Sequence, residues 1–302
     1  MRIVSLLPSA TEIVCELGLR GQLVGVTHEC DYPPGVSSLP HVARTHLPAA
    51  ASSGEIDRLV REQLATERSL YQLDHERLAA LEPDLIITQS LCDVCAVAES
   101  DVQRALCRLP HGAALLNLEP QSLTEVLDSV VTVAEAAGLR ERGIEARRRL
   151  QSRIDAVKEA VNVSARPRVV VLEWIDPPFS AGHWAPEIVE LAGGQEMIGR
   201  AGERSVALNW EQVAATRPEV LFISCCGFSI ERSKQDLPLL FDHLAGLQLP
   251  CFEHGNVFVL DGSAYLSRPG PRLVEALELM ARAMHPKRVQ APVNSSGIER
   301  VT

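Results

Sequence analysis

The chain alternates short, continuous apolar runs with longer amphipathic stretches. The runs at residues 3–7, 23–27, 85–88, 169–172 and 220–224 are rich in Val, Ile and Leu, and polar or turn residues follow them. Runs of this length favour buried strands, whereas the stretches between them have the spacing of amphipathic helices. Continuous apolar strands that alternate with helices are typical of a parallel sheet covered on both faces, so we predict an α/β fold.

One part of this pattern occurs twice, at an offset of 135 residues. Residues 73–88 and 208–223 share Leu, Glu, Ala, Ala and Pro at matching positions. Each copy starts at a residue type that caps helices, and a proline ends the short helix before an apolar strand follows. A weaker likeness relates residues 2–6 to residues 168–172, so we predict two similar halves. The capping residues are Asp74 and Asn209, and the prolines are Pro83 and Pro218.

The stretch between the two halves predicts helices. Residues 122–137 form one amphipathic helix, and residues 140–161 predict another of about 22 residues, roughly 33 Å long at 1.5 Å per residue. The predicted organisation is an N-terminal α/β lobe at 1–121, linking helices at 122–163 that include an inter-lobe backbone helix, a C-terminal α/β lobe at 164–285, and a flexible tail at 286–302.

Composition and charge narrow the range of possible functions. In 302 residues, 39 acidic side chains outnumber 29 basic ones, which leaves a formal net charge of −10. This argues against a nucleic-acid surface, which needs clustered Lys and Arg. No apolar run approaches the ~20 residues that cross a bilayer, and the first residues lack signal-peptide features, so we predict a cytoplasmic protein without membrane insertion. The eight cysteines are then expected to stay reduced, as packing residues, metal ligands or redox groups.

Reactive and aromatic side chains gather directly after the predicted strands. Ligands of parallel α/β sheets bind at the carboxyl ends of the strands, so these loops are expected to form the site. The side chains are His28, Glu29, Cys30 and Tyr32 after the strand at 23–27; Gln89, Cys92 and Cys95 after 85–88; Trp174, His183 and Trp184 after 169–172; and Cys225, Cys226 and Gly227 after 220–224.

Two of these cysteines have the spacing of a metal or redox site. The two residues between Cys92 and Cys95 let both thiolates face one point, which suits a soft metal or a redox disulfide. His28 and Cys30 from a neighbouring loop complete a set of one nitrogen and three sulfurs. The predicted metal ligands are therefore Cys30, Cys92, Cys95 and His28, with buried packing as the alternative for each cysteine.

Other side chains suit contact with an organic ligand. Trp174 and Trp184 offer flat apolar faces to a large ring system, with packing as the alternative. His28 and His183 stand at strand-end loops, either as ligand or metal contacts or as hydrogen-bonded loop residues. Ser9, at a strand-to-helix turn, is expected to cap a helix and not to act as a nucleophile.

Several stretches resemble a known family. Residues 2–12 (RIVSLLPSATE), 23–27 (LVGVT), 81–86 (LEPDLI) and 268–272 (RPGPR) resemble the class III substrate-binding proteins of ABC importers, which bind vitamin B12 and ferric siderophores. The resemblance spans residues 2 to about 284. It is closest to the cobalamin-binding branch, and the cysteine-bearing stretches at 27–33 and 89–95 resemble a cytosolic subgroup of the family.

This resemblance implies a fold and a site. The fold is two Rossmann-like parallel-sheet lobes joined by one long backbone helix, and the ligand lies between the lobes. The positions that match the cleft are Pro8, Ser9, the loop at 28–30, Tyr32, Trp174, His183, Trp184 and residues 225–227.

Two functions follow from these observations. The first is a non-catalytic binding protein for a cobalamin-like corrinoid or another metal chelate, with an ABC importer as the partner that the resemblance implies. Its ligand contacts are Pro8, Ser9, His28, Glu29, Tyr32, Gln89, Trp174, His183, Trp184, Cys226 and Gly227. The alternative is a cytosolic metalloprotein or thiol-redox enzyme that holds a transition metal at Cys92, Cys95, Cys30 and His28.

Overall fold

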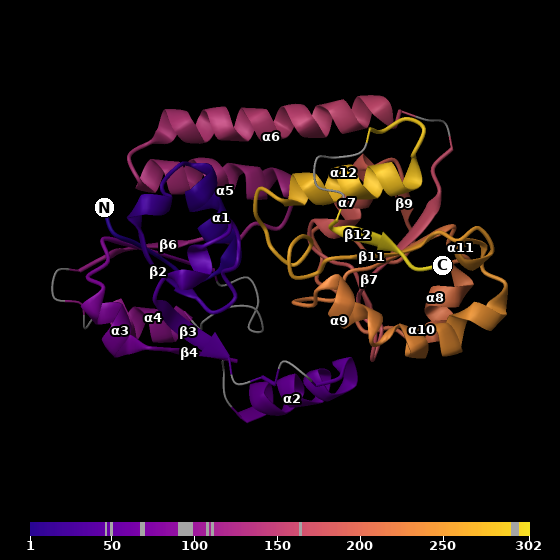
Figure 1. The fold of residues 1–302 in the computed structure, drawn as a ribbon, viewed down its shortest axis with the longest axis horizontal. Coiled ribbons are helices and arrows are strands. Elements are labelled where there is room, and N and C mark those ends of the chain that lie inside the picture. The colour runs from indigo at the N-terminus through magenta and orange to yellow at the C-terminus, as the bar shows by residue number, and fades with distance from the viewer. Residues whose placement is uncertain are drawn as a thin grey trace. The chain divides into compact units, whose positions relative to one another are not determined.

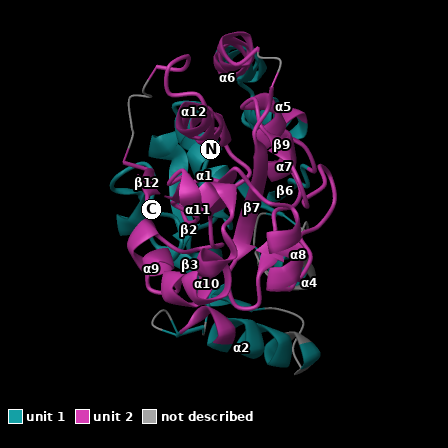
Figure 2. Cartoon of the chain, turned by 90° about the vertical axis from the view of Figure 1, so that its right-hand side faces the viewer, with its two compact units in different colours: residues 1–51, 55–120, 125–149 teal, residues 52–54, 121–124, 150–302 magenta. Residues whose placement is uncertain are grey.

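Two compact α/β units make up the chain. A computed structural model describes residues 1–45, 47–48, 51–66, 70–89, 99–106, 109, 112–162, 165–290 and 296–302. The first unit is built from residues 1–51, 55–120 and 125–149, and the second from residues 52–54, 121–124 and 150–302 (Figure 2). Each unit has a sheet rich in parallel strands, which confirms the predicted fold class.

The first unit contains a six-stranded sheet in the order β4-β3-β2-β1-β5-β6. Figure 1 labels β2, β3, β4 and β6 of this sheet. All neighbouring pairs are parallel except β3 and β4, which are antiparallel. Helix α1 packs against β1 and β2, while α3 and α4 enclose an apolar core with β1, β3 and β5. The elements that lie wholly or partly in this unit are β1 (Ile3–Ser5), α1 (Pro8–Glu16), β2 (Leu23–Thr27), β3 (His41–Thr45), α2 (Ser53–Thr66), β4 (Tyr71–Leu73), α3 (His75–Ala80), β5 (Leu85–Thr88), α4 (Glu99–Leu106), β6 (Ala114–Asn117), α5 (Leu123–Ala136) and α6 (Arg140–Ala160).

The second unit has the strand order β12-β11-β10-β7-β8, with β9 also paired to β7. The central strands β7, β10 and β11 are parallel, and β8 and β12 run antiparallel to their neighbours. Helix α7 packs against α12 and β7. The elements are β7 (Arg168–Trp174), β8 (Phe179–Ser180), α7 (Ala185–Leu191), β9 (Gln195–Glu196), α8 (Trp210–Ala215), β10 (Val220–Ile223), α9 (Ile230–Lys234), α10 (Leu237–Leu244), α11 (Pro250–Glu253), β11 (Val257–Leu260), α12 (Leu273–Met284) and β12 (Ile298–Arg300).

The two copies of the sequence repeat fold alike. The side chains of Asp74 and Asn209 accept hydrogen bonds from the backbone N–H three residues on, so both cap their helices as predicted. Each helix then ends at a residue in the left-handed region, Glu82 at φ 44° and Arg217 at φ 45°. A proline follows each of them and prevents the helix from continuing.

The weaker sequence likeness near the start of each half corresponds to matching hydrogen bonds in the structure. The backbone N–H of Arg2 donates to the carboxylate of Asp84 at 2.6 Å, and that of Arg168 donates to the carboxylate of Glu219 at 2.9 Å. In both units the arginine Nε also donates to a carbonyl at the end of the repeat helix. These matching contacts fix β1 beside β5 and β7 beside β10.

Two predictions near the chain ends need correction. The apolar run at 3–7 is a strand only as far as Ser5, because Pro8 starts α1 and Leu7 is its N-cap residue. Ser9 therefore lies buried in the first turn of α1 and does not cap the helix. Residues 298–300, predicted to belong to an irregular tail, form β12 and pair with β11. A three-residue edge strand is too short to show a period in the sequence.

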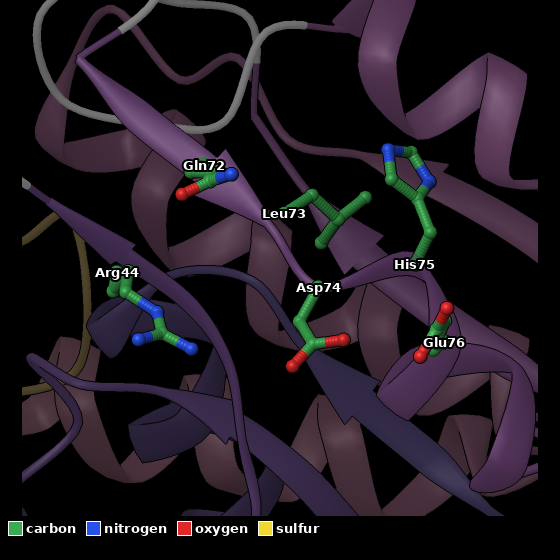
Figure 3. Close-up of a pocket in the computed structure, with 6 residues that line it drawn as sticks. All are labelled: Arg44, Gln72, Leu73, Asp74, His75 and Glu76. Atoms are coloured by element: carbon green, nitrogen blue, oxygen red, sulfur yellow. The ribbon is translucent and has the colours of Figure 1, made fainter.

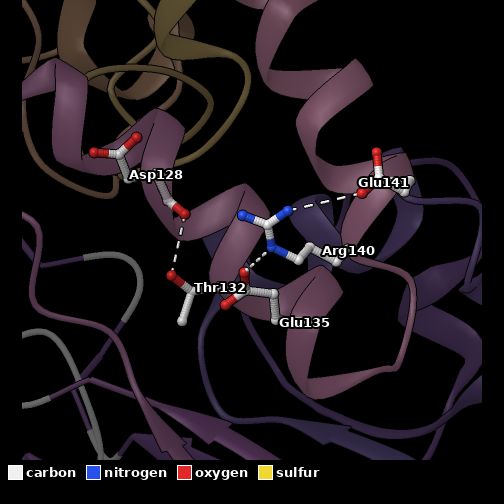
Figure 4. Close-up of polar contacts among 5 residues, drawn as sticks. All are labelled: Asp128, Thr132, Glu135, Arg140 and Glu141. Carbon is white, nitrogen blue, oxygen red and sulfur yellow. Dashed lines mark hydrogen bonds and ion pairs between the residues drawn. The ribbon is translucent and has the colours of Figure 1, made fainter.

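The predicted linking helices are α5 and α6. The boundary between the two units falls inside α6, between Arg149 and Leu150, whereas the sequence placed α5 and α6 together in a linker. At the turn between these helices, Arg140 pairs with Glu135 at 2.7 Å and Glu141 at 3.7 Å, as Figure 4 shows. These charges are exposed, so the cluster adds little stability. In the described part of the chain, the helices are too short or too polar to cross a membrane.

Candidate ligand-binding site

His28 and Glu29 form a polar cluster with Tyr71 at the carboxyl end of β2. The backbone N–H and the ring Nδ1 of His28 both lie within hydrogen-bond distance of the Ala43 carbonyl oxygen, at 3.2 and 3.3 Å. The Tyr71 hydroxyl donates to the Glu29 carboxylate at 2.9 Å, and its ring centroid lies 6.0 Å from that of His28. The cluster therefore joins the loop after β2 to the middle of β3 and the start of β4.

Cys30, two residues further on, points into the first unit. Its sulfur accepts a hydrogen bond from the Thr11 hydroxyl at 3.1 Å and lies 3.3 Å from the Thr27 hydroxyl. The side chain is buried, which fits the packing alternative for this cysteine. Tyr32, by contrast, is 40% exposed in the loop that follows.

The remaining predicted ligand contacts of the first unit differ in how exposed their side chains are. Pro8 is partly exposed at the first position of α1, whereas Ser9 beside it is buried. Gln89 is buried directly after β5, and its Oε1 finds no hydrogen-bond partner among the described residues. A buried polar oxygen without a partner costs free energy, so Oε1 is a candidate acceptor for a ligand or water.

The predicted metal ligands are only partly covered by the structure. Cys92 and Cys95 lie outside the described residues. Within the described ranges, three or more His, Cys, Asp or Glu side chains do not come together in a way that would hold a free metal ion. The four-ligand set of His28, Cys30, Cys92 and Cys95 stays a prediction from the sequence.

Trp174, at the end of β7, forms an aromatic platform with Phe228 in the second unit. The indole Nε1 donates to the carbonyl oxygens of Ser53, at 3.2 Å, and Asp176, at 3.1 Å. The ring centroids of Trp174 and Phe228 are 4.8 Å apart. The Arg232 guanidinium lies 4.2 Å from the centroid of Phe228 and pairs with Asp236. We call Trp174 and Phe228 the aromatic platform, which is partly exposed through the indole.

Backbone contacts fix the loop that carries Phe228. Cys226 donates its N–H to the Glu173 carbonyl at 3.0 Å, and Phe228 closes a turn by donating to the Cys225 carbonyl at 3.0 Å. Gly227 has φ 73° in this turn, which suits a residue without a side chain. Gly262 approaches the same turn so closely that a Cβ would overlap the Cys225 carbonyl oxygen. The loops after β7, β10 and β11 therefore meet at one edge of the sheet.

The vicinal cysteines of this loop have different environments. Cys225 is buried, and burial raises the pKa of its thiol to about 12. Cys226 is exposed beside Gly227. The thiol of Cys225 is therefore an unreactive packing group, because the thiolate is the reactive form of cysteine. Cys226 is the thiol of this pair that a ligand can reach.

His183 and Trp184 lie between β8 and α7. Trp184 is only 5% exposed and donates its Nε1–H to the Leu266 carbonyl at 2.8 Å, so its indole packs inside the unit. His183 is stacked on it, with ring centroids 5.4 Å apart, and has a left-handed backbone at φ 52°. Burial, with a contribution from Arg204, lowers the pKa of His183 and keeps the imidazole neutral near pH 7. Its buried Nδ1 makes no hydrogen bond to the described residues.

Sequence reasoning missed three side chains of these clusters. Phe228 directly follows the predicted loop at 225–227, and its aromatic character was a usable signal. Tyr71 and Arg232 had no such signal. Tyr71 reaches Glu29 across 42 positions of the chain, and Arg232 meets Phe228 from a separate helix.

A pocket of about 420 Å³ in the first unit has a different character. Figure 3 shows its lining on β3, β4 and the start of α3: Arg44, Gln72, Leu73, Asp74, His75 and Glu76. Most of these side chains are charged or polar. The lining extends toward the amino end of β3, away from the strand ends that carry His28 and Tyr71. The pocket therefore does not suit a large apolar ring system.

Comparisons with known proteins agree with this architecture. Residues 3–264 match the periplasmic binding protein family. The vitamin B12-binding protein of Vibrio cholerae serotype O1 is 24% identical over 284 residues, which cover 92% of this chain and 86% of the relative.

Solved structures match the fold over nearly the whole chain. The apo periplasmic heme-binding protein RhuT from Roseiflexus sp. RS-1 superposes with a TM-score of 0.70 at 23% identity, covering 94% of this chain and 98% of RhuT. The vitamin B12-binding protein BtuF of Vibrio cholerae superposes with a TM-score of 0.69 at 22% identity, covering 96% of this chain and 98% of BtuF. These likenesses establish the fold.

The comparisons also correct a prediction. The matching proteins are periplasmic, so the predicted cytoplasmic location is wrong. The first residues form β1 of the folded unit and carry no information on the compartment. The comparisons support the family that the sequence resembles, without support for a cytosolic, cysteine-bearing subgroup. The family consists of solute-binding proteins and not enzymes, which confirms the prediction of a non-catalytic chain.

Proposed function

This chain belongs to the periplasmic binding protein family, and we propose that it binds a metal chelate with a large ring, of the vitamin B12 or haem kind. Binding proteins of this kind bind small-molecule chelates and serve ABC importers. The chain would release its ligand chemically unchanged to such an importer.

The aromatic platform is the observation that carries this proposal. Two hydrogen bonds from the Trp174 Nε1 and the packing of Phe228 hold the indole in place before a ligand arrives. A fixed aromatic face offers a large apolar contact area, and little conformational freedom is lost on binding. The partly exposed indole of Trp174 suits contact with a corrin or porphyrin ring better than contact with a small polar solute.

The polar groups at the strand ends are proposed as further ligand contacts. In the first unit these are His28, Glu29 and the exposed ring of Tyr32, and in the second unit His183 and Cys226. A few polar groups among apolar walls fix the orientation of a ligand and give specificity. The other proposed contacts are Pro8, Ser9, Gln89, Trp184 and Gly227, of which Ser9, Gln89 and Trp184 need a movement of their surroundings to reach a ligand.

Charge favours a corrinoid over haem as the first ligand to test. The chain carries a net charge of −10, which opposes the approach of an anionic haem with two propionates. A cobalamin carries neutral amide side chains and a cationic cobalt centre, so this repulsion is absent. The vitamin B12-binding relative from Vibrio cholerae matches over 92% of the chain, which supports the same choice.

Titration of the purified chain tests the proposal. Hydroxocobalamin and haemin are added separately, and binding is followed by calorimetry and by the visible spectrum. Trp174→Ala is expected to weaken binding at least tenfold, or about 1.4 kcal/mol. The matched control is Trp210→Ala, because Trp210 is a partly buried indole stacked on His243 in another part of the same unit. The affinity of Trp210→Ala for the chelates is expected to stay at the wild-type value.

Two outcomes would count against the proposal. The first is no saturable binding of either chelate up to about 1 mM, which corresponds to only about −4 kcal/mol. The second is equal loss of affinity in both tryptophan variants, which would indicate a general effect on the unit and not a contact of the aromatic platform.

A further inference from the structure

We propose that the ion pair of Arg232 and Asp236 holds the aromatic platform in its binding orientation and thereby controls the affinity for the ligand. The inference rests on the proposed function and deepens it, because it names the side chains that fix Trp174 before a ligand arrives. Neither charged residue is a proposed ligand contact, so both are positioning residues. The platform and the ion pair all lie in the second unit.

Arg232 contacts the aromatic platform directly, through Phe228. Its guanidinium carbon lies 4.2 Å from the centre of the Phe228 ring, within the distance of a cation–π contact. The same ring packs against Trp174, with 4.8 Å between the ring centroids. Phe228 is only 7% exposed, so little water screens its contact with the guanidinium. A change at Arg232 therefore reaches the indole through one intervening ring.

The backbone of Phe228 is held on both sides, which leaves its ring as the movable part. The N–H donates to the Cys225 carbonyl at 3.0 Å, and the carbonyl accepts from the Ser263 N–H at 3.0 Å. These bonds fix the backbone from which the side chain extends, whereas the rotamer of the side chain depends on what the ring touches. The contacts of the ring with Arg232 and Trp174 therefore decide its orientation.

Trp174 needs this support, because its hydrogen bonds hold the indole at one atom. Nε1 donates to the carbonyl oxygens of Ser53, at 3.2 Å, and Asp176, at 3.1 Å. A ring that is held at Nε1 keeps the freedom to swing about that atom unless a second contact opposes the movement. Phe228 supplies this second contact, and Arg232 fixes Phe228 in turn.

Asp236 and the packing of α9 set the position of the guanidinium. Nη1 of Arg232 lies 3.2 Å from Oδ2 of Asp236, and the two side chains are 15% and 13% exposed. Helix α9, which carries Arg232, packs on β11, and Lys234 of the same helix pairs with Glu299 of β12 at 2.8 Å. An arginine side chain has many rotamers, and a fixed counter-charge restricts them. The sheet of the second unit therefore holds the ion pair in place.

Stability alone does not account for a pair of charges in this position. Removing two charges from water costs about as much free energy as their attraction returns, so apolar side chains of similar volume would serve the core equally well. An apolar side chain would lack the attraction between a cation and the face of an aromatic ring. The pair gives Phe228 a directional contact, which is the property that a positioning role requires.

Fluorine NMR of protein labelled with fluorotryptophan tests the effect on the platform without a ligand. Trp174, Trp184 and Trp210 give one signal each, and Trp174→Phe assigns the signal of the platform. Arg232→Met keeps much of the side-chain length without the charge, and it is expected to shift or broaden the Trp174 signal while the other two stay unchanged. Arg232→Lys keeps a cation near the ring and is expected to retain part of the wild-type signal position.

Calorimetric titration with hydroxocobalamin and with haemin measures the effect on binding. Arg232→Met and Asp236→Asn are each expected to weaken binding roughly three- to tenfold, and Arg232→Lys is expected to weaken it less. The matched control is Arg153→Met, because Arg153 pairs with Glu278 at 2.8 Å in the same unit, with both side chains partly shielded from solvent. This control is expected to leave the Trp174 signal and the affinity at their wild-type values. Urea unfolding of each variant checks that it is folded under the conditions of the titration.

The possible results separate this inference from the proposed function. If Arg232→Met and Arg232→Lys both keep the wild-type Trp174 signal and affinity, the inference is overturned and the proposed function stands. The same holds if the Trp174 signal moves while the affinity does not, because the orientation of the platform then does not control binding. If Arg153→Met lowers the affinity as much as Arg232→Met, the effect is a general one and the inference is overturned. If the wild type binds neither chelate, the proposed function fails, and the control of affinity fails with it.

Discussion

The strand ends of the two units are built on the same backbone pattern but carry different chemistry. In the first unit, His28, Glu29 and Tyr71 form a polar cluster, in which the Tyr71 hydroxyl donates to Glu29 and the Tyr71 ring lies beside the imidazole of His28. In the second, Trp174 and Phe228 form the aromatic platform. Each sheet also contains one copy of the repeated helix, proline and strand, and the two copies share their caps, their left-handed residue and their strand pairing.

This difference separates the residues that make the fold from those that make the site. The repeated residues recur because each fulfils the same backbone requirement in both units: a helix cap, a helix stop or a buried strand position. Loops after the strands meet no common backbone requirement, so their side chains are free to differ. One edge can therefore offer polar side chains while the other offers aromatic ones.

The largest loss of stability is expected at the strand ends of the second unit, where the backbone of Gly262 lies directly against that of Cys225. A Cβ at Gly262 would overlap the Cys225 carbonyl oxygen and lie 2.7 Å from its carbonyl carbon, so Gly262→Ala forces two loops apart. The free energy of unfolding is expected to fall by about 3 kcal/mol. Urea unfolding followed by tryptophan fluorescence measures it, because Trp174, Trp184 and Trp210 all lie in the second unit.

Gly246→Ala is the matched control for this substitution. Its Cβ meets no atom within 4 Å, and its backbone is outside the left-handed region, so stability is expected to change by less than about 0.5 kcal/mol. Equal stability of the Gly262 and Gly246 variants would show that the loops after β10 and β11 do not meet as closely as the structure has them.

The second unit contains a buried carboxyl group, Glu196, with a shifted pKa. The free energy of unfolding is therefore expected to depend on pH. Burial raises the pKa of Glu196 in β9 from 4.5 to about 7. The folded chain therefore binds this proton more tightly than the unfolded chain, and stability is lost as pH rises from about 4.5 to about 7. Glutamine does not ionise, so the Glu196→Gln variant does not lose this stability as pH rises. Relative to the wild type, its unfolding free energy is expected to rise by about 2 kcal/mol between pH 5 and pH 8.

The same fluorescence-detected urea unfolding, repeated across pH, measures this difference. His183 and His285 have lowered pKa values caused mainly by burial, so their contribution is lost as pH falls below about 6.5, in the opposite direction. Both histidines are present in the variant and the wild type, so their contribution cancels in the comparison. A constant difference between the two proteins across this range would contradict a raised pKa for Glu196.

The smallest effects test whether the repeat is equivalent in both units. Glu82→Gly and Arg217→Gly place glycine at the two left-handed positions, where it has no steric penalty. Each is expected to stabilise its unit by about 0.5 kcal/mol, a rise of roughly 1–2 °C in Tm. Circular dichroism on heating measures both variants. Glu76→Gly and Glu211→Gly, inside the exposed faces of α3 and α8, are controls expected to cost about 1 kcal/mol. If only one of Glu82→Gly and Arg217→Gly raises the stability, the two copies of the repeat are not equivalent.

Much of the scaffold could be predicted because its signals are local. The caps at Asp74 and Asn209 and the prolines after Glu82 and Arg217 each act within a few residues, so their order in the chain fixed the short helices. The start of α1 was harder to predict. Pro8 and Ser9 both suit the first residues of a helix, and the capping preference of serine competed with the preference of proline for the first helical position.

The candidate site was only partly predictable. Placing His28, Trp174 and Cys226 after strands followed from the general position of ligands in parallel sheets. The same rule did not distinguish Trp184, which is buried, from Trp174, which is partly exposed. The difference arises because Leu266 accepts the indole N–H of Trp184 from a segment 82 residues away.

The sequence by itself determined the two parallel-sheet units and the duplicated frame, because apolar period, caps and prolines are read from neighbouring residues. Only the tertiary structure decided which side chains at the strand ends work together. The Ala43 carbonyl lies within hydrogen-bond distance of the His28 ring, and Phe228 with Ser53 holds Trp174. Each of these contacts joins distant segments, so its partner depends on how the whole unit packs and not on the order of residues along the chain.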